Sequence, residues 1–195
     1  MSVLERGFKS WAERLSEGVR RDLGIPPAGV LNPDRLAAYL AVELLTPLDI
    51  PGIPPEVLDQ LLEKDPWGWS ATTQIVGKRT IVIINPRHSA GRRASNVMHE
   101  MAHLLLDHEP SKIMLLHDGS LVMRTFDQRQ EDEANWLSGC LLLPRVALLR
   151  VVRERKNAEE IATEFGVSEV LVNYRVRITG VAAQAKSASR SRRAG

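Results

Sequence analysis

The chain has 195 residues, 44% of them hydrophobic and 26% charged, which is ordinary for a globular protein with one core. No apolar run is long enough to span a membrane, the N-terminus lacks the pattern of a signal peptide, and Cys140 is the only cysteine, so we expect a cytoplasmic protein without disulfides or membrane contact. The net charge is +2, but residues 181–195 hold four basic side chains and no acid, which leaves 22 basic and 24 acidic residues elsewhere and excludes a basic nucleic-acid-binding body.

The first part of the chain is predicted to be helical. Residues 4–23 carry an apolar stripe at helical spacing, which ends at Gly24 and the prolines after it. A second helix begins at Asn32, a good N-cap before proline, and is predicted to continue through Leu44 to a Thr-Pro pair. A third, short helix spans about residues 56–64. We therefore expect an N-terminal helix and linker over residues 1–30, followed by the main core.

The periodicity then changes to that of strands. Residues 70–76 and 79–85 are rich in Thr, Ile and Val and are separated by a Gly-Lys pair, which predicts a β-hairpin. Either Ser89 or Ser95 can begin the helix that follows. An exposed edge strand beside that helix could pair with an extended peptide, and residues 81–84 are the candidate for that strand or its neighbour. Four successive aliphatic residues fit a buried core strand equally well.

The helix after the hairpin carries a His-Glu-x-x-His motif, His99-Glu100-Met-Ala-His103, in an apolar run. Residues four apart lie on one face of a helix, so His99 and His103 can present two imidazoles to a single metal ion. Zinc suits neutral imidazole, accepts three protein ligands with one open position, and activates a water molecule there. Glu100 is placed to accept the proton of that water as general base. The motif therefore predicts hydrolysis, although Mn or Fe would suit the same ligands.

Two histidines leave the site one protein ligand short. Glu109, six residues past His103, would need a glycine at the bend, where the chain has leucine, and His108 falls off the ligand face of the helix. The better candidate is Glu131, in the acidic first turn of a second helix that stops before Pro144. Asn135 lies four residues further on the same face, and we expect it to steady a ligand histidine from outside the metal sphere.

The two motifs together, His-Glu-Met-Ala-His-Leu-Leu-Leu and Glu-Asp-Glu-Ala-Asn-Trp-Leu-Ser-Gly-Cys-Leu-Leu-Leu-Pro, resemble the ImmA/IrrE family of zinc metallopeptidases. The resemblance covers about residues 36–180 in element order. It implies that His99, His103 and Glu131 bind zinc and that Glu100 is the catalytic base. Glu133 is the alternative third ligand, because the family pattern often has acids at both places. The chain departs from the family in having Trp-Leu after Asn135, a change at packing positions.

The resemblance also implies a fold and a role. The fold is a minimal zincin of the α+β class, mostly helical, with a small antiparallel or mixed sheet beside the metal-binding helix, which we expect over residues 31–150. Characterised members of the family are intracellular proteases that cleave a helix-turn-helix transcriptional repressor and so relieve repression of mobile-element or DNA-damage genes. A repressor of this kind is therefore the expected protein substrate.

The C-terminal part, residues 151–180, has the pattern of a helix-turn-helix segment packed on the core, and residues 181–195 are predicted to form a disordered basic tail. A DNA-binding role would place Asn173, Arg175 and Arg177 in a major groove. Four glutamates on the same unit oppose contact with phosphates, so direct DNA binding is the less favoured alternative. The preferred interpretation is a helical pair that closes the core or docks the repressor.

The sequence leaves two questions open. A hydrolase of this kind needs a donor for the anionic intermediate, and the candidates it offers are foremost His88 and His117, and also Tyr39, Arg92 and Arg124. Two other functions also compete with that of a protease: a non-catalytic, metal-containing transcriptional regulator that acts through the helix-turn-helix-like segment, and a protein that binds a repressor without cutting it.

Overall fold

The computed structural model describes residues 4–108, 114–115, 121–122 and 127–185. The helices in this part of the chain are α1 (Phe8–Asp22), α2 (Pro33–Tyr39), α3 (Pro55–Asp59), α4 (Ala90–Leu105), α5 (Gln128–Leu142), α6 (Arg145–Arg153), α7 (Ala158–Phe165) and α8 (Glu169–Thr179). The strands are β1 (Val42–Leu45), β2 (Ala71–Val76), β3 (Arg79–Ile84), β4 (Met114–Leu115) and β5 (Leu121–Val122). A 3-10 turn, η1 (Pro47–Asp49), follows β1, and a π-helical turn, η2 (Gln60–Lys64), extends α3.

The predicted hairpin is present and forms most of a three-stranded mixed sheet with the order β1-β3-β2. β2 and β3 are antiparallel, with Thr73 opposite Val82, and β1 runs parallel to β3, with Leu44 opposite Val82. β3 is thus the central strand, and Val82 is fully buried. Residues 81–84, the candidate for an exposed edge strand or its neighbour, therefore lie in the central strand, and their neighbour β2 is an edge strand of the sheet. β4 and β5 form a separate two-stranded ladder.

The prediction that the second helix continues through Leu44 is wrong. α2 ends at Tyr39, Ala41 has a positive φ of 55°, and the chain then enters β1. Val42 and Leu44 are as compatible with a strand as with a helix, and pairing with β3 satisfies the backbone groups on one side of this segment over four residues. The helical periodicity of the segment is therefore overridden by a contact with a strand almost 40 residues further along the chain.

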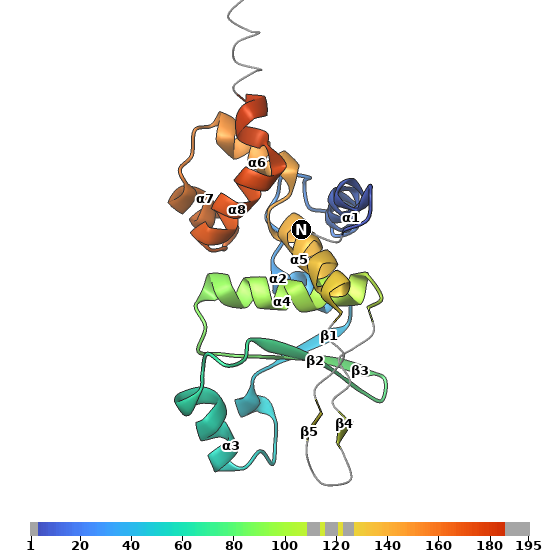
Figure 1. Cartoon of the computed structure of the whole chain (residues 1–195), viewed down its shortest axis with the longest axis vertical. Coiled ribbons are helices and arrows are strands. Elements are labelled where there is room, and N and C mark those ends of the chain that lie inside the picture. The colour runs from blue at the N-terminus through green and yellow to red at the C-terminus, as the bar shows by residue number, and fades with distance from the viewer. Residues whose placement is uncertain (1–3, 109–113, 116–120, 123–126, 186–195) are drawn as a thin grey trace, which may run out of the picture.

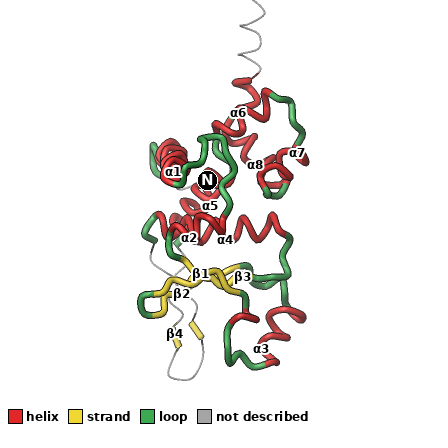
Figure 2. The backbone as a smooth tube through the Cα atoms, turned by 180° about the vertical axis from the view of Figure 1, so that it is seen from behind, coloured by secondary structure: helices red, strands yellow, loops and turns green. Residues whose placement is uncertain are grey.

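α4 lies between the sheet and α5, as Figures 1 and 2 show from opposite sides. Met98 and Met101 of α4 and Leu137 and Leu141 of α5 are fully buried in this middle layer. Complete burial of such a side chain stabilises a fold by roughly 1.5–3 kcal/mol, so the apolar faces of the two helices fix their relative position. α1 packs on the other side of α5, and α6, α7 and α8 form the end of the molecule remote from the sheet (Figure 1).

The C-terminal end of α5 is tied to α1 by buried polar side chains. Ser16 Oγ donates to the carbonyl of Cys140 at 2.7 Å, and the guanidinium of Arg20 donates to the carbonyl of Leu141 at 2.6 Å. Both side chains belong to residues that are fully buried. The last carbonyls of a helix lack partners within the helix and carry partial negative charge, so a buried arginine here satisfies both needs.

α8 contributes a second buried arginine to the same place. Arg175 donates to the carbonyl of Leu143 at 3.0 Å and pairs with the carboxylate of Glu13 at 2.7 Å, and its side chain is only 1% exposed. The less favoured alternative, in which Arg175 reads a DNA groove, is therefore contradicted for this residue by its burial. The helix stripe of α8 that contains it faces the core, whereas Asn173 and Arg177 are exposed.

The α7 and α8 pair has the predicted short connection. Asn157 and Glu160 form a capping box at the start of α7, Gly166 ends it in the left-handed conformation, and Ser168 caps α8. Residues 181–185, predicted to belong to a disordered tail, are helical, and Val181 is fully buried; the other residues of that predicted tail lie outside the described part of the chain. In the described part of the chain, no single helix has the length and apolar character of a membrane span; α5 and α6 together meet those criteria, but with a bend of 48° between them.

Candidate metal centre

α4 presents the two histidines of the motif on one face. The side chain of Ser89 caps the helix, and the backbone is then regular as far as Leu105. His99 and His103 stand one turn apart, and their Nε2 atoms are 3.0 Å from each other. The two imidazoles therefore converge on one point, as the spacing of the motif predicts.

α5 brings a carboxylate to the same point. Asp127 caps this helix by accepting hydrogen bonds from the backbone N–H groups of Arg129 and Gln130, which places Glu131 in the first turn. One carboxylate oxygen of Glu131 lies 3.2 Å from His99 Nε2, and the other lies 3.5 Å from His103 Nε2.

The three side chains fit a metal ion. Their ligand atoms all lie within 4.8 Å of one another, and no other such group occurs among the described residues. Two nitrogens that bind one tetrahedral zinc ion stand about 3.3 Å apart, close to the 3.0–3.5 Å separations found here. The side chains of His99, His103 and Glu131 are 22%, 14% and 21% exposed, so the cluster is reachable from solvent and not sealed in the core.

Glu100 points to the sheet. Its carboxylate accepts a hydrogen bond from the hydroxyl of Thr73, which lies on the edge strand β2. This hydrogen bond holds the Glu100 carboxylate beside the edge strand of the sheet, and Glu100 is adjacent in the chain to the ligand candidate His99. Nothing in the sequence singles out Thr73, because a threonine in a strand is ordinary; only the position of β2 over α4 gives it this partner.

Glu133 does not join the cluster. Its carboxylate lies 3.2 Å from His108 Nε2 and accepts a hydrogen bond from Arg129 Nε at 2.9 Å, and this contact is the main cause that raises the pKa of Arg129. His108, in turn, has its Nδ1 atom 2.9 Å from Nδ1 of His103. The structure thus favours Glu131 over Glu133 as third ligand. His108 lies off the ligand face of α4, as predicted, but it contacts the ligand candidate His103.

Asn135 is placed differently from the prediction. Its side chain is exposed and lines a cavity that also borders His99. Within the described residues, no hydrogen bond joins that side chain to His99; the contact to a ligand-candidate histidine is made by His108 instead, on His103. Asn135 therefore lies on the side of α5 that faces α4, as its spacing from Glu131 predicted. Its side chain does not form the predicted hydrogen bond to the imidazole of His99.

The structure does not bring the described oxyanion candidates to the cluster. His88 is buried, accepts a hydrogen bond from Asn96, and stacks on Trp67. Burial, and then the nearby charge of Arg92, lower the pKa of His88, so its imidazole is neutral at neutral pH.

The other candidates give no further donor. Tyr39 is 51% exposed on α2, and Arg92 lies over the ring of Trp67. His117, Arg124 and the rejected ligand Glu109 lie outside the described residues.

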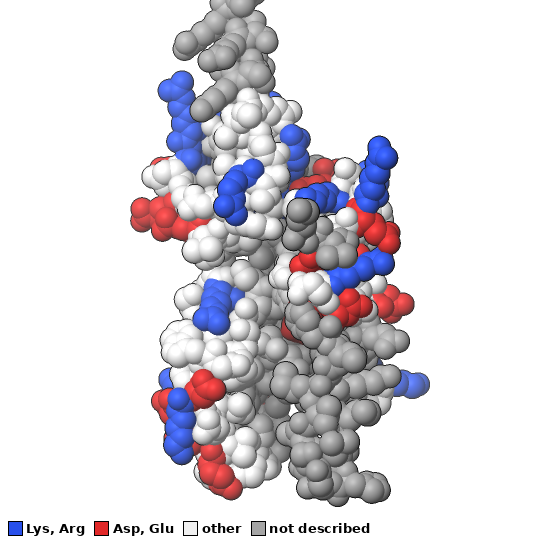
Figure 3. Space-filling model, in the orientation of Figure 1, with Lys and Arg blue, Asp and Glu red and all other residues white. Residues whose placement is uncertain are grey.

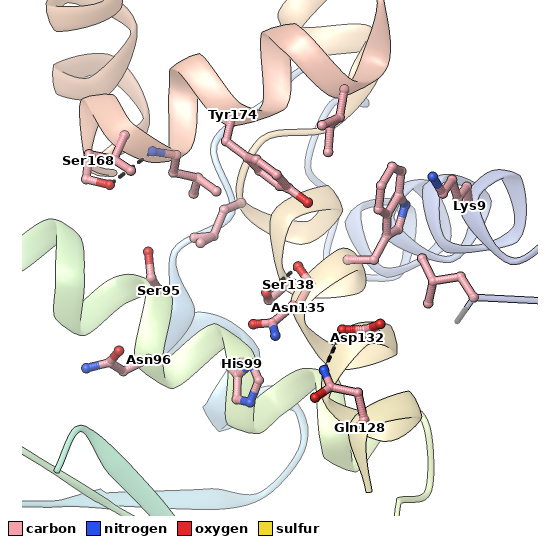
Figure 4. Close-up of a pocket in the computed structure, with 16 residues that line it drawn as sticks. Lys9, Ser95, Asn96, His99, Gln128, Asp132, Asn135, Ser138, Ser168 and Tyr174 are labelled. Atoms are coloured by element: carbon pink, nitrogen blue, oxygen red, sulfur yellow. Dashed lines mark hydrogen bonds between the residues drawn. The ribbon is translucent and has the colours of Figure 1, made fainter. Parts of the chain in front are cut away.

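A cavity of about 1020 Å³ lies between α4, α5 and α8 (Figure 4). Tyr174 reaches toward it from α8, and Asn135 and Asp132 border it from α5. Of the His-Glu-x-x-His residues and Glu131, only His99 lines it. The cavity therefore adjoins the metal-ligand cluster but does not contain it.

A small mixed sheet beside a His-Glu-x-x-His helix, with a carboxylate from the following long helix, defines a zincin-like α+β fold of the metallopeptidase type. The sequence matches the IrrE N-terminal-like domain of the peptidase M78 family over residues 60–177, which is more than half of the chain. The chain belongs to this family, and the resemblance noted from its motifs is confirmed.

Comparison with solved structures agrees on the fold. A Mycobacterium tuberculosis transcriptional regulator superposes with a TM-score of 0.54 at 14% sequence identity, over 86% of this chain and 46% of that chain. The present chain thus spans less than half the length of that protein. No curated protein matches the sequence. At this identity the likeness concerns the fold alone.

Proposed function

We propose that this chain is a zinc-dependent endopeptidase. The observation that carries the proposal is the convergence of His99, His103 and Glu131 within 4.8 Å, with Glu100 next to the first histidine. Membership of a peptidase family supports the reaction type, and the two-imidazole, one-carboxylate ligand set is one that catalytic zinc uses.

In this proposal each residue of the site has a distinct role. Zinc bound by the three side chains would lower the pKa of a water molecule and polarise the scissile carbonyl. Glu100 accepts the proton of that water and delivers it to the leaving amine. The hydroxyl of Thr73 donates a hydrogen bond to the Glu100 carboxylate and so holds this carboxylate beside the edge strand β2.

The edge strand β2 supports a polypeptide as substrate. It pairs only with β3 in the described sheet, and Thr73 on this strand contacts Glu100. An extended segment that paired along the free side of β2 would run past the catalytic carboxylate, with main-chain hydrogen bonds providing affinity without strong sequence preference.

We further propose a helix-turn-helix transcriptional repressor as the substrate, cleaved inside the cell. This follows the role of the characterised members of the family that the motifs resemble, and the similar M. tuberculosis structure is described as a transcriptional regulator. The single cysteine, buried and unpaired, suits a reducing compartment.

The test is a cleavage assay on candidate repressors with the parent protein and with Glu100→Gln. The variant is expected to bind zinc as the parent does, because Glu100 is not a ligand, and to lose cleavage by a factor of at least about 100, because general-base catalysis contributes on that order. Glu56→Gln, at an exposed position of α3, serves as the control and should cleave normally. Normal cleavage by Glu100→Gln would refute the general-base assignment, and absence of zinc from the parent would refute the peptidase.

A non-catalytic regulator is the second candidate, favoured by the description of the structural neighbour. Two observations weigh against DNA recognition by α8: Arg175 is buried, and basic and acidic side chains are interspersed on the face seen in Figure 3. A mobility shift of operator DNA that persists in the presence of a chelator would support the regulator.

A further inference from the structure

We propose that His108 and Glu133 form a relay that fixes the orientation and the tautomer of His103, and that they act as positioning residues for the metal site. The proposal rests on the proposed function insofar as His103 is taken as a metal ligand. It assigns roles to two side chains that the His-Glu-x-x-His motif does not include.

The relay is made possible by the way α4 ends. Asp107 adopts the left-handed conformation with φ of 52°, the backbone N–H of His108 donates to the carbonyl of His103 at 3.0 Å, and that of Asp107 donates to Leu104. This pair of hydrogen bonds is the Schellman arrangement, which reverses the chain at a helix C-terminus. His108 is therefore folded back beside His103 instead of continuing around the helix.

The hydrogen-bond directions along the relay are determined at its two ends. His103 needs a lone pair on Nε2 to bind a metal, so its proton must sit on Nδ1 and point at Nδ1 of His108, 2.9 Å away. His108 must then accept at Nδ1 and carry its own proton on Nε2, which faces the Glu133 carboxylate at 3.2 Å. Both nitrogens of His108 are thereby engaged, so it is a partner of His103 and not a fourth ligand.

The far end of the relay is anchored and shielded. Arg129 Nε donates to the second oxygen of Glu133 at 2.9 Å, one turn earlier on α5. The side chains of His108 and Glu133 are only 7% and 10% exposed, less than those of the three ligand candidates. Because water is largely excluded here, these hydrogen bonds are not readily exchanged for solvent, and the imidazole of His103 is held in one orientation.

The relay also assigns separate roles to the two glutamates of α5. Glu131 and Glu133 are two residues apart, so their side chains diverge around the helix: Glu131 meets the Nε2 atoms directly, and Glu133 reaches the opposite nitrogen of His103 through His108. The two acids of the Glu-Asp-Glu motif thus both serve the same site, one from each side of an imidazole.

The experiment compares zinc affinity, measured by chelator competition, in the parent and in His108→Leu, Glu133→Gln and the double variant. Loss of a partner of this kind weakens metal binding by roughly 10- to 100-fold, and we expect His108→Leu to fall in this range and Glu133→Gln at its lower end. His108→Asn, whose amide oxygen can accept at the position of Nδ1, should recover most of the affinity. Because the relay is a series, Glu133→Gln should change the affinity little once His108 is leucine.

Two further measurements separate positioning from folding. The melting temperature of each metal-free variant reports damage to the fold, and the visible spectrum of the cobalt-substituted protein reports the ligand geometry, which should change in His108→Leu and be restored in His108→Asn. Glu164→Gln is the matched control, since Glu164 also accepts from an arginine, in a salt bridge on α7, and it should leave zinc affinity unchanged.

The outcomes are distinct. Zinc affinities within twofold of the parent in both single variants, or fully additive losses in the double variant, would overturn the relay while leaving the metal site intact. A parent protein that binds no zinc would instead overturn the proposed function. Loss of metal in Glu133→Gln as complete as in Glu131→Ala would show that Glu133 is itself a ligand, which also overturns the relay.

Discussion

The two ends of α5 both place polar groups in the interior of the protein, but with opposite results. At its C-terminal end, the carbonyls of Cys140, Leu141 and Leu143 are met by Ser16, Arg20 and Arg175 at 2.6–3.0 Å. At its N-terminal end, Glu131 faces two histidine nitrogens that are directed at one point and are 14–22% exposed. The first arrangement satisfies the carbonyls at the helix end and stabilises the fold, whereas the second directs the lone pairs of three side chains at a common point where a metal ion can bind.

The difference shows how burial alone is a poor guide to function. The most deeply buried charges of the protein, Arg20 and Arg175, have no chemical role in the proposed site, because each is engaged by carbonyl and carboxylate or hydroxyl partners. The groups that can do chemistry are half-buried and converge on one point. The predictions that follow test this contrast, from the largest expected effect to the smallest.

The first prediction concerns the N-terminal end. Glu131→Ala removes a ligand, and we expect metal affinity to fall by more than about 100-fold, beyond the range that a partner outside the metal sphere would produce. Elemental analysis after dialysis should find about one zinc per chain in the parent and none in the variant. The comparison is Glu133→Ala, which should retain metal at micromolar zinc; the reverse pattern would make Glu133 the ligand.

The second prediction concerns the C-terminal end. Arg175→Met removes the guanidinium that pairs with the Glu13 carboxylate and donates to the Leu143 carbonyl, and we expect the free energy of unfolding to fall by about 3 kcal/mol. Denaturant titration measures this change. Arg177→Met, at an exposed position on the same helix, should change stability by less than about 0.5 kcal/mol. Equal effects of the two substitutions would mean that the buried ion pair of Arg175 and Glu13 contributes no more to stability than an exposed arginine does.

The third prediction concerns Cys140, which lies at the same satisfied end. Burial raises the pKa of its thiol to about 12 from an ordinary value of 9.0, so the folded protein holds this proton more tightly than the unfolded chain does. Stability from this source is fully present below pH 9 and is lost as the pH rises above it, by about 1 kcal/mol per pH unit. The loss from the thiol extends to about pH 12. Above about pH 10 it is opposed by Arg20, because burial lowers the pKa of Arg20 to about 10, so that the folded protein gives up this proton before the unfolded chain does.

The measurement for the thiol is the free energy of unfolding at pH 8, 9 and 10, in the parent and in Cys140→Ala. The decrease above pH 9 should be smaller in the variant, and the folded parent should resist alkylation at pH 8. Rapid modification of Cys140 in the folded protein would contradict the burial of its thiol.

Much of the site follows from local rules. Helical spacing places His99 and His103 on one face whatever the rest of the fold, and the acidic first turn after Asp127 makes Glu131 a candidate from its position in the chain alone. The hairpin and the capped starts of α2 and α5 are equally local, since they depend on turn residues and N-caps.

Contacts between distant segments account for what the sequence did not predict. Whether residues 42–45 form a strand depends on β3, and the partner of Glu100 depends on where β2 crosses α4. His108 and Glu133 are 25 residues apart in the chain and meet only because α5 packs against the C-terminal end of α4.

The sequence by itself determined the chemistry that is available: two imidazoles and a base on one helix, a carboxylate on the next, and the family that combines them. Only the tertiary structure decided which glutamate faces the cluster, that Arg175 is a buried clamp instead of a DNA-reading side chain, and that His103 has a partner on its second nitrogen. The reason is physical: helix periodicity and caps act over a few residues, whereas hydrogen-bond partners in the interior are set by which elements pack together.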